Sequence, residues 1–464
     1  MNRLERIKKV IGNDGLMISV VVFLVGFSWS WLFTSRVTEL ADSALVGYAL
    51  ALTAFLIIVS LSSYVFVKTI FFFNRKFLSK NKVSFWVIPL LFVVWAGAEY
   101  LVALLSALIW IGRDGSLDTV VPFASFAPIV SHTPLRFLSR LVGFHGLSSV
   151  VVVFIYVFGV KKLRKYAFVT FAIVVIATTC SWAVFRTPNG PAINSLIVAE
   201  KLYERTGMVS DSHDLVVFPE YGLDGSGSGR DRISLEKKNN VFYVGSKQVP
   251  AKKGHKNILV FGSAQYGDVE QRAKSRLIPG GEYLPYFAQA VLKITRAEHT
   301  LGYFETLNAV EKGTSNYLPL NAGNKFYLGS SVCSSIIATE DYRRFTANGA
   351  TVLTNSASLG IFNSSLFTFQ HQGLAKFMAT ANARPFLQSS NDADAFSIDH
   401  DGNMVAKISP INTQEVTVVS NTKRTPYTLL GEWPAYLGLV AVGVMIFRKS
   451  RLFERLKKIG KPLT

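Results

Sequence analysis

The hydrophobic residues of this chain are concentrated in long runs, five within the first 185 residues and one near the C-terminal end. The runs cover residues 16–33, 44–67, 86–111, 147–160, 166–184 and 433–447. A helix that crosses the hydrocarbon layer of a bilayer needs about 20 mostly apolar residues, and most of these runs approach that length. The pattern therefore predicts a membrane α-helical bundle of about six transmembrane helices.

Between the fifth and sixth runs the pattern changes, and short apolar segments are bounded by turn residues. Such segments are typical of β-strands and cover residues 215–218, 241–244, 258–261, 325–332, 351–354, 396–398 and 416–419. Apolar positions at helical spacing cover residues 196–205, 336–345 and 367–381. Strands and helices that alternate in this way predict a layered α/β domain.

The two patterns divide the chain into three predicted parts. Residues 1–185 contain about five transmembrane helices, residues 186–427 form the α/β domain, and residues 428–464 contain the last transmembrane helix and a basic tail. Three apolar segments of the α/β domain are candidates either for contact with the bilayer or for the hydrophobic core of the domain. They cover residues 283–291, 301–304 and 362–377.

The distribution of charge predicts the orientation of these parts. The chain has a net charge of +19, which by itself would suggest a nucleic-acid partner. However, 20 basic and only 3 acidic residues lie in the two terminal segments and in alternate loops between the predicted helices. This asymmetry is the positive-inside pattern of membrane proteins. We therefore expect cytoplasmic termini, an extracytoplasmic α/β domain and no nucleic-acid partner.

Cys333 is the first candidate for chemistry. The chain has two cysteines, and Cys180 lies inside the fifth apolar run, so the two cannot easily form a disulfide. Cys333 ends an apolar strand and precedes a helix predicted to start near Ser335, whose N-terminus would stabilise a thiolate. The alternative is a small buried hydrophobic side chain.

Metal and cofactor chemistry has no supporting motif. The histidines of the α/β segment show neither HxH nor HExxH spacing, and no base partner for Cys333 is apparent among them: His213, His255, His299, His371 and His400. The glycine-rich stretch 225–229 is followed by Arg230 where a dinucleotide-binding loop has its third glycine. We expect no metal and no bound cofactor.

Two further segments combine with Cys333 into a recognisable set. The apolar strand 215–218 ends in Pro219 and Glu220, and the stretch 274–285 begins with Lys274 and contains Glu282 between glycines and prolines. An acid at a strand end, a lysine and a cysteine at a strand-to-helix turn resemble the Glu-Lys-Cys triad of the nitrilase superfamily.

The predicted membrane helices narrow this resemblance to the apolipoprotein N-acyltransferase family. Residues 274–285 are similar to that family's K-x-x-L-x-P-x-G-E-x-x-P stretch, residues 218–220 to its W-P-E stretch, and residues 332–336 to its I-C-Y-E-I stretch. Weaker similarities occur at 383–391, at 431–434, at Gly143 and Gly146, and at Trp95 and Glu99. The chain is identified from these motifs as a divergent member.

The resemblance implies a fold, a reaction and a place in the cell. It implies a four-layer αββα nitrilase-like domain at the outer face of the bacterial inner membrane. Glu220 would take the proton of Cys333, Lys274 would stabilise the oxyanion, and Glu282 would position Lys274 or share the proton transfer. The acyl donor would be a phospholipid, and the acceptor would be the α-amino group of a lipoprotein's diacylglyceryl-cysteine.

Trp95 and Glu99, in the third apolar run, are a candidate membrane-helix site. A carboxylate within the hydrocarbon layer is costly and is usually functional or paired. Glu99 is therefore expected either to contact a lipid head group or the catalytic domain, or to form a hydrogen-bonded contact between helices.

Departures from the family pattern leave three functions open. Ser334 and Ser335 stand where the family has tyrosine and glutamate, and the stretch 354–360 lacks the family's acid and tryptophan. In addition, no opening strand is visible after Val184, and two of the family's usual eight helices are missing. The hypotheses are an acyltransferase that uses a lipoprotein or another amine, a membrane-tethered nitrilase-type amidase or hydrolase, and a catalytically silent binding or assembly module.

Overall fold

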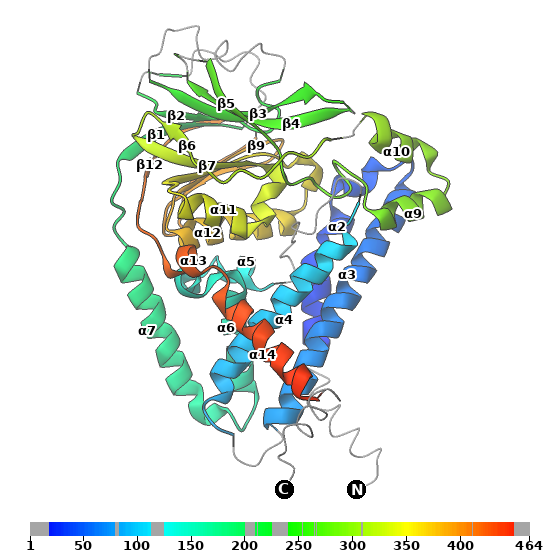
Figure 1. Cartoon of the computed structure of the whole chain (residues 1–464), viewed down its shortest axis with the longest axis vertical. Coiled ribbons are helices and arrows are strands. Elements are labelled where there is room, and N and C mark those ends of the chain that lie inside the picture. Colours follow the sequence, from blue (N-terminus) through cyan, green and yellow to red (C-terminus); the bar gives the residue numbers. More distant parts are fainter. Residues whose placement is uncertain are drawn as a thin grey trace, which may run out of the picture.

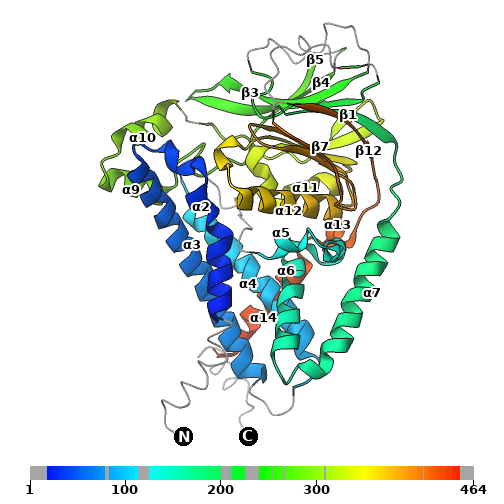
Figure 2. The same ribbon diagram turned by 180° about the vertical axis from the view of Figure 1, so that it is seen from behind.

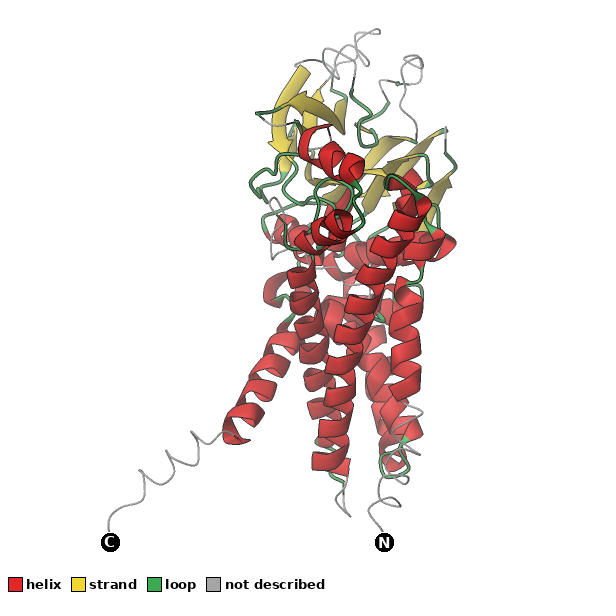
Figure 3. Ribbon diagram, turned by 90° about the vertical axis from the view of Figure 1, so that its right-hand side faces the viewer, coloured by secondary structure: helices red, strands yellow, loops and turns green. Residues whose placement is uncertain are grey.

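The computed structural model describes residues 18–78, 83–112, 125–199, 209–210, 212–224, 240–252, 254–263, 265, 267–307, 310–410 and 412–449. Helices occupy one end of the molecule and strands the other (Figures 1 and 3). Most of the predicted basic segments at the two termini, and the glycine-rich stretch 225–229, lie outside the described residues.

Each of the six apolar runs coincides with a helix. These helices are Ile18–Thr34, which ends in α2 (Trp31–Thr34), α3 (Ala44–Phe73), α4 (Val87–Ile109), α6 (Ser139–Gly159), α7 (Ala167–Phe185) and α14 (Trp433–Lys449). Four helical stretches are long and apolar enough to cross a membrane, at 44–78, 87–109, 134–159 and 164–185. The apolar parts of the other two are shorter, so a total of six transmembrane helices stays a prediction.

The α/β part consists of two six-stranded sheets. The first has the order β12-β1-β2-β3-β4-β5, from β1 (Ala192–Val198), β2 (Leu215–Val217), β3 (Phe242–Pro250), β4 (His255–Ser263), β5 (Gly267–Ala273) and β12 (Thr413–Val419). The second has the order β11-β10-β9-β8-β7-β6, from β6 (Leu320–Ala322), β7 (Phe326–Val332), β8 (Val352–Ser358), β9 (Phe386–Asn391), β10 (Ala395–Ile398) and β11 (Met404–Ile408). Three neighbouring strands are parallel in each sheet, β1–β3 and β7–β9.

The two sheets pack face to face around one apolar core. Val217 and Phe261 of the first sheet meet Leu328 and Val352 of the second in this core. Helices α11 (Thr339–Ala347) and α12 (Ser365–Asn382) cover the other face of the second sheet and lie between it and the membrane helices (Figures 1 and 2). The predicted α/β domain is thus confirmed. No helix of the described residues covers the outer face of the first sheet, so the fourth layer stays a prediction.

Two predictions about secondary structure are wrong. The helix expected over 196–205 is contradicted at its start, because residues up to Val198 belong to β1. This strand lies between β12 and β2, and its apolar residues Leu196–Val198 are buried on both faces, which removes the alternation that marks a half-buried strand. β1 is also the opening strand that is not visible in the sequence.

The helix expected next to Cys333 begins later than predicted. A 3₁₀ turn covers Cys333–Ile337, and α11 starts only at Thr339. The thiol therefore does not lie at the N-terminus of an α-helix, and a helix dipole is not the means by which its charge is stabilised.

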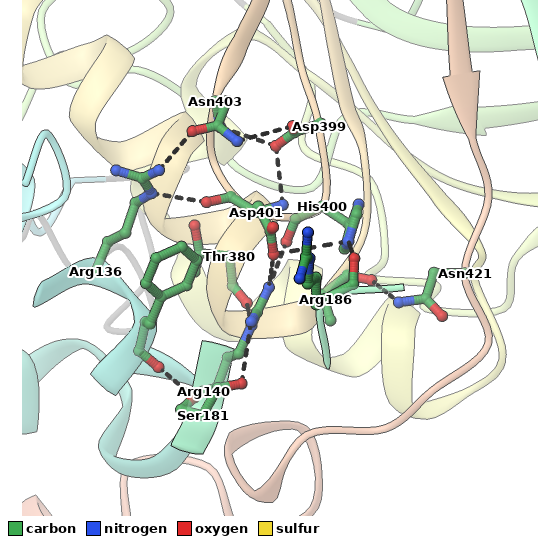
Figure 4. Close-up of polar contacts among 12 residues, drawn as sticks. Arg136, Arg140, Ser181, Arg186, Thr380, Asp399, His400, Asp401, Asn403 and Asn421 are labelled. Atoms are coloured by element: carbon green, nitrogen blue, oxygen red, sulfur yellow. Dashed lines mark hydrogen bonds and ion pairs between the residues drawn. The ribbon is translucent and has the colours of Figure 1, made fainter. Parts of the chain in front are cut away.

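A cluster of polar contacts joins the sheets to the membrane helices (Figure 4). The guanidinium of Arg140, near the start of α6, is fully buried. It donates hydrogen bonds to Ser181 O at the end of α7 (3.3 Å), Thr380 O of α12 (3.1 Å) and His400 O in the β10–β11 turn (2.9 Å). It also forms a 2.6 Å ion pair with Asp401. One side chain thus fastens three elements that are far apart in sequence.

Replacing Arg140 with methionine is expected to lower the free energy of unfolding by about 3 kcal/mol or more, because it leaves a largely buried carboxylate and three carbonyls without their donor. Thermal unfolding in detergent measures this loss. The matched control is Arg36→Met, which removes the ion pair with Glu39 in which both side chains are 63% exposed, and we expect a change below about 1 kcal/mol. Equal melting of the two variants would contradict this role for Arg140.

Candidate active site

Glu220, Lys274 and Cys333 each follow the end of a strand. Glu220 comes three residues after β2, Lys274 directly after β5, and Cys333 directly after β7. β2 and β5 belong to the first sheet and β7 to the second, so the packing of the sheets brings the three residues together at one edge. The Nζ atom of Lys274 lies 3.1 Å from Glu220 Oε1, and the Cys333 thiol is near enough to the Glu220 carboxyl to influence its pKa.

Glu282 completes the group from the loop that follows Lys274. Its Oε1 atom lies 2.8 Å from Lys274 Nζ and accepts a 2.7 Å hydrogen bond from Asn257 Nδ2. Its Oε2 atom accepts a 2.8 Å hydrogen bond from the backbone N–H of Ile278. Glu282 is therefore held from three sides, and Lys274 lies between two fixed carboxylates.

All four side chains are withdrawn from solvent. The exposed fractions are 2% for Glu220, 4% for Lys274, 6% for Glu282 and 2% for Cys333. Cys333 also adopts a left-handed backbone conformation (φ 48°), which is strained for a residue with a Cβ and is often found at functional sites. Its Sγ atom lies 3.8 Å from the carbonyl oxygen of Ser358, at the end of β8.

The electrostatics of the group follow from burial and from the mixture of charges. Burial favours neutral Lys274, but the charges of Glu220 and Glu282 outweigh it and raise the pKa of the ammonium well above its ordinary value. Burial and the nearby Glu282 raise the pKa of Glu220 against the opposing effect of Lys274. Burial and the Glu220 charge raise the pKa of Cys333, so the resting sulfur is a thiol beside a carboxylate that can accept its proton.

Cys333, Glu220 and Glu282 line a cavity of about 290 Å³, here called the Cys333 cavity. Most of its wall is apolar and aromatic, and part of that wall comes from the end of the first helix (Ile18–Thr34) and from Trp110, directly after α4. The aromatic and imidazole side chains that line it are Trp29, Trp31, Trp110, Tyr221, Phe362, Phe367 and His371. The Cys333 thiol therefore faces a largely apolar cavity.

The three apolar segments of the α/β domain have different surroundings. Segment 362–377 is mostly α12, which is largely buried, with Phe362 and Phe367 on the wall of the Cys333 cavity. The other two belong to an arm of α9 (Tyr286–Ile294) and α10 (Glu298–Gly302) beside the N-terminal end of α3 (Figure 1). Tyr286 and Ile294 of α9 are 56% and 82% exposed, which leaves apolar surface on this arm.

Trp95 and Glu99 lie elsewhere. Glu99 is buried within the helices and accepts hydrogen bonds from Trp95 Nε1 (3.1 Å), Ser125 Oγ (3.0 Å) and Ser148 Oγ. Neither residue lines the Cys333 cavity. The structure therefore does not bring this pair together with the other four candidates.

Sequence reasoning missed several residues of the site. Asn257, which orients Glu282, lies on β4 and belongs to no motif. Tyr221 follows Glu220 directly, and its hydroxyl accepts a 3.1 Å hydrogen bond from Asn257. Trp29 and Trp31 lie in an apolar run whose hydropathy indicates only a membrane helix. The position of Tyr221 beside Glu220 is the one signal that could have been used.

Among the described residues, no group of three or more His, Cys, Asp or Glu side chains is arranged to hold a metal ion. The nucleophilic and charged groups gathered at this site are the Cys333 thiol and two carboxylates, which line the cavity, and the Lys274 ammonium bound to both carboxylates, a set typical of nucleophilic catalysis. Together with the apolar wall, they define a protein that combines helices long and apolar enough to cross a membrane with a cluster of Cys, Glu and Lys at the edge of two packed sheets.

Comparison with known proteins agrees with this class. The chain is 25% identical over 206 residues to the apolipoprotein N-acyltransferase of Vibrio vulnificus, 29% over 188 residues to that of Methylococcus capsulatus and 25% over 205 residues to that of Aquifex aeolicus. These matches cover 42%, 38% and 43% of this chain and 39%, 34% and 44% of the relatives, so each spans less than half of either protein. They confirm the resemblance found in the sequence motifs: the chain is a divergent relative of the apolipoprotein N-acyltransferases.

Solved structures and family models add little to this assignment. A carbon-nitrogen hydrolase from Helicobacter pylori is 15% identical with a TM-score of 0.38, and it aligns over 59% of this chain and all of its own. A nitrilase-superfamily amidase from Nesterenkonia is 11% identical with a TM-score of 0.37, over 54% of this chain and 98% of its own. No family model matches the chain.

Proposed function

We propose that this protein is a membrane acyltransferase that moves an acyl chain from a phospholipid, through a thioester on Cys333, to the α-amino group of a lipoprotein's diacylglyceryl-cysteine. The observation that carries the proposal is a thiol and a carboxylate on the wall of a largely apolar and aromatic cavity, with the Lys274 ammonium 3.1 Å from that carboxylate. The names of the relatives support the same reaction.

In the first half-reaction, the Cys333 thiol gives its proton to Glu220 while Sγ attacks the ester carbonyl of the donor. The negative charge that develops on the carbonyl oxygen is stabilised by the ammonium of Lys274. When this intermediate collapses, the C–O bond breaks, the thioester remains on Cys333, and the leaving alkoxide takes the proton back from Glu220. The released product is a lysophospholipid.

In the second half-reaction, the neutral amine of the acceptor attacks the thioester carbonyl and passes a proton to Glu220. The C–S bond breaks, an amide forms, and the Cys333 thiolate recovers the proton. An amine attacks a thioester faster than water does, and an apolar wall that excludes water favours transfer over hydrolysis. Glu282 acts on both steps as a positioning residue, because it holds Lys274 at 2.8 Å.

The proposed location follows from the charge pattern and the helices. We place residues 1–185 and 428–464 in the bacterial inner membrane with cytoplasmic ends, and residues 186–427 on the periplasmic side as a nitrilase-like catalytic domain. Both substrates are lipids of the outer face of that membrane, and the Cys333 cavity lies where α12 meets the first helix and the end of α4.

Intact-protein mass spectrometry after incubation with phospholipid tests the proposal. The expected result is a fatty-acyl adduct on the protein that hydroxylamine removes. When a diacylglyceryl-cysteine peptide is added, the acyl group should move from the protein to the peptide and form an amide. Rapid release of free fatty acid without an amine would favour the membrane-tethered hydrolase instead. An absent adduct at short times, with no acceptor present, would favour the silent relative.

The rate of thioester formation is expected to fall as the pH is lowered, because Glu220 must be ionised to accept the thiol proton. Burial and Glu282 raise the pKa of Glu220 above its ordinary value of 4.5, so the acidic limb of the pH–rate profile should have its midpoint above pH 4.5. Stopped incubations between pH 4 and 9, read by mass spectrometry, give the profile (the range is about that over which carboxylates and thiols titrate). A midpoint at or below 4.5 would exclude Glu220 as the base.

A further inference from the structure

His371 places an unpaired imidazole on the wall of the Cys333 cavity. It lies on α12, is 2% exposed, and its Nε2 atom has no hydrogen-bond partner among the described residues. Its ring packs against Phe367, with centroids 5.7 Å apart, and against Phe396 at 6.3 Å. Burial lowers the pKa of His371 to about 3, so the imidazole is neutral and carries one N–H donor. A buried polar atom without a partner is costly, and a ligand in the cavity can supply one.

A second cavity, of about 240 Å³, lies beside Gln370, the residue before His371 on α12. It is lined by three polar residues, Ser28, Ser125 and Gln370, and by apolar side chains of the first helix, α3, α4, α12 and the segment 126–129. None of its lining residues is charged. The Gln370 side chain is buried and donates a 3.0 Å hydrogen bond to Ser28 O, which fastens α12 to the first helix beside this second cavity.

The two cavities share two walls. Residues Val21 to Ser28 of the first helix line the second cavity, and Trp29, Trp31 and Leu32 of the same helix line the Cys333 cavity. On α12, Leu366 and Gln370 face the second cavity, while Phe367 and His371 face the Cys333 cavity. Two apolar compartments therefore follow one another along the first helix, and the polar residues of α12 lie between them.

A ligand that matches this arrangement has two apolar chains joined by an uncharged polar group. We infer that a diacylglyceryl group occupies both cavities, with the reacting chain in the Cys333 cavity, the other chain in the second cavity, and the ester carbonyl of that other chain accepting a hydrogen bond from His371. This inference rests on the proposed function. The diacyl phospholipid donor and the diacylglyceryl acceptor share the chemistry.

The contribution of His371 is tested with a matched pair of donors. One is a diester phospholipid, and the other carries its second chain through an ether, which removes the carbonyl but keeps the reacting ester. Unmodified protein is expected to form the thioester about five- to tenfold faster from the diester, the effect of one hydrogen bond. In His371→Phe the rates with the two donors should lie within about twofold of each other. The inference for the donor is overturned if the unmodified protein does not prefer the diester donor, or if His371→Phe keeps that preference.

The second cavity is tested by filling it. Leu366→Trp is expected to slow thioester formation from a diacyl donor by about tenfold or more relative to its effect on a lysophospholipid, which has one chain. The single-chain donor shows that the variant is folded. Equal slowing with both donors would overturn the assignment of the second cavity.

Separate assays of the two half-reactions distinguish whether the two cavities bind the phospholipid donor or the diacylglyceryl acceptor. In the second half-reaction, ester and ether forms of the diacylglyceryl-cysteine peptide are offered to the preformed thioester. If the ester peptide reacts faster, and His371→Phe abolishes this preference in the second half-reaction but not in the first, the two cavities are assigned to the acceptor. Binding of the ester and ether lipids to Cys333→Ala protein requires no chemistry. A preference in binding that His371→Phe abolishes upholds the inference even if no thioester ever forms, and no preference in any assay refutes it.

Discussion

Cys333→Ala protein is expected to show no fatty-acyl mass after incubation with phospholipid, and its rate of acyl transfer should fall by at least about 10⁴-fold, the scale of removing a covalent nucleophile. The reason is that no other described residue at the site can form the thioester: the second cysteine, Cys180, is exposed on α7. The measurement is the intact mass of the purified protein together with the yield of N-acylated peptide.

Cys180→Ala is the matched control for this experiment. It removes the other thiol and should leave both the adduct and the yield of peptide unchanged. Alanine at position 333 occupies the same left-handed backbone as cysteine and loses one sulfur atom, so a folded variant is expected. An adduct that persists in Cys333→Ala and disappears in Cys180→Ala would show that the nucleophile is assigned to the wrong residue.

The residues of the site could be predicted from sequence where strand ends and motifs coincide. Glu220 and Cys333 each follow an apolar run that reads clearly as a strand, and Lys274 and Glu282 share one stretch of prolines and glycines. Parallel strands of two packed sheets bring such ends to one edge, so the short distances among these side chains follow from topology.

Other parts of the fold carried no usable pattern. β9 (Phe386–Asn391) is buried along its whole length although most of its residues are polar, so neither hydrophobicity nor alternation marks it. β1 is buried on both faces over Leu196–Val198 and resembles a helix at that length. The aromatic wall of the Cys333 cavity comes from Trp29 and Trp31, whose apolar surroundings indicate only a membrane helix. These features depend on contacts between distant segments, which no local pattern contains.

Lys274→Met is expected to slow thioester formation by about 10³-fold, with losses from two causes. The first is the donor to the oxyanion, whose removal alone costs about 10²–10³-fold in comparable enzymes. The second is the base: Lys274 holds down the pKa of Glu220, and without it two buried carboxylates, Glu220 and Glu282, face each other with no cation between them. The pKa of Glu220 then rises further, and a smaller fraction of the protein has an ionised base at neutral pH.

The pH–rate profile separates this mechanism from a general loss of structure. In Lys274→Met the acidic limb should move to higher pH than in the unmodified protein, whereas a merely unstable variant would lose amplitude with its midpoint unchanged. The control is Lys256→Met on β4, which removes a half-exposed 2.9 Å ion pair with Glu311 and should change the rate by no more than about twofold. If Lys274→Met retained its rate and its acidic limb, the ammonium would have no part in stabilising the oxyanion or in setting the pKa of Glu220, and the proposed mechanism would have to place both tasks on other groups.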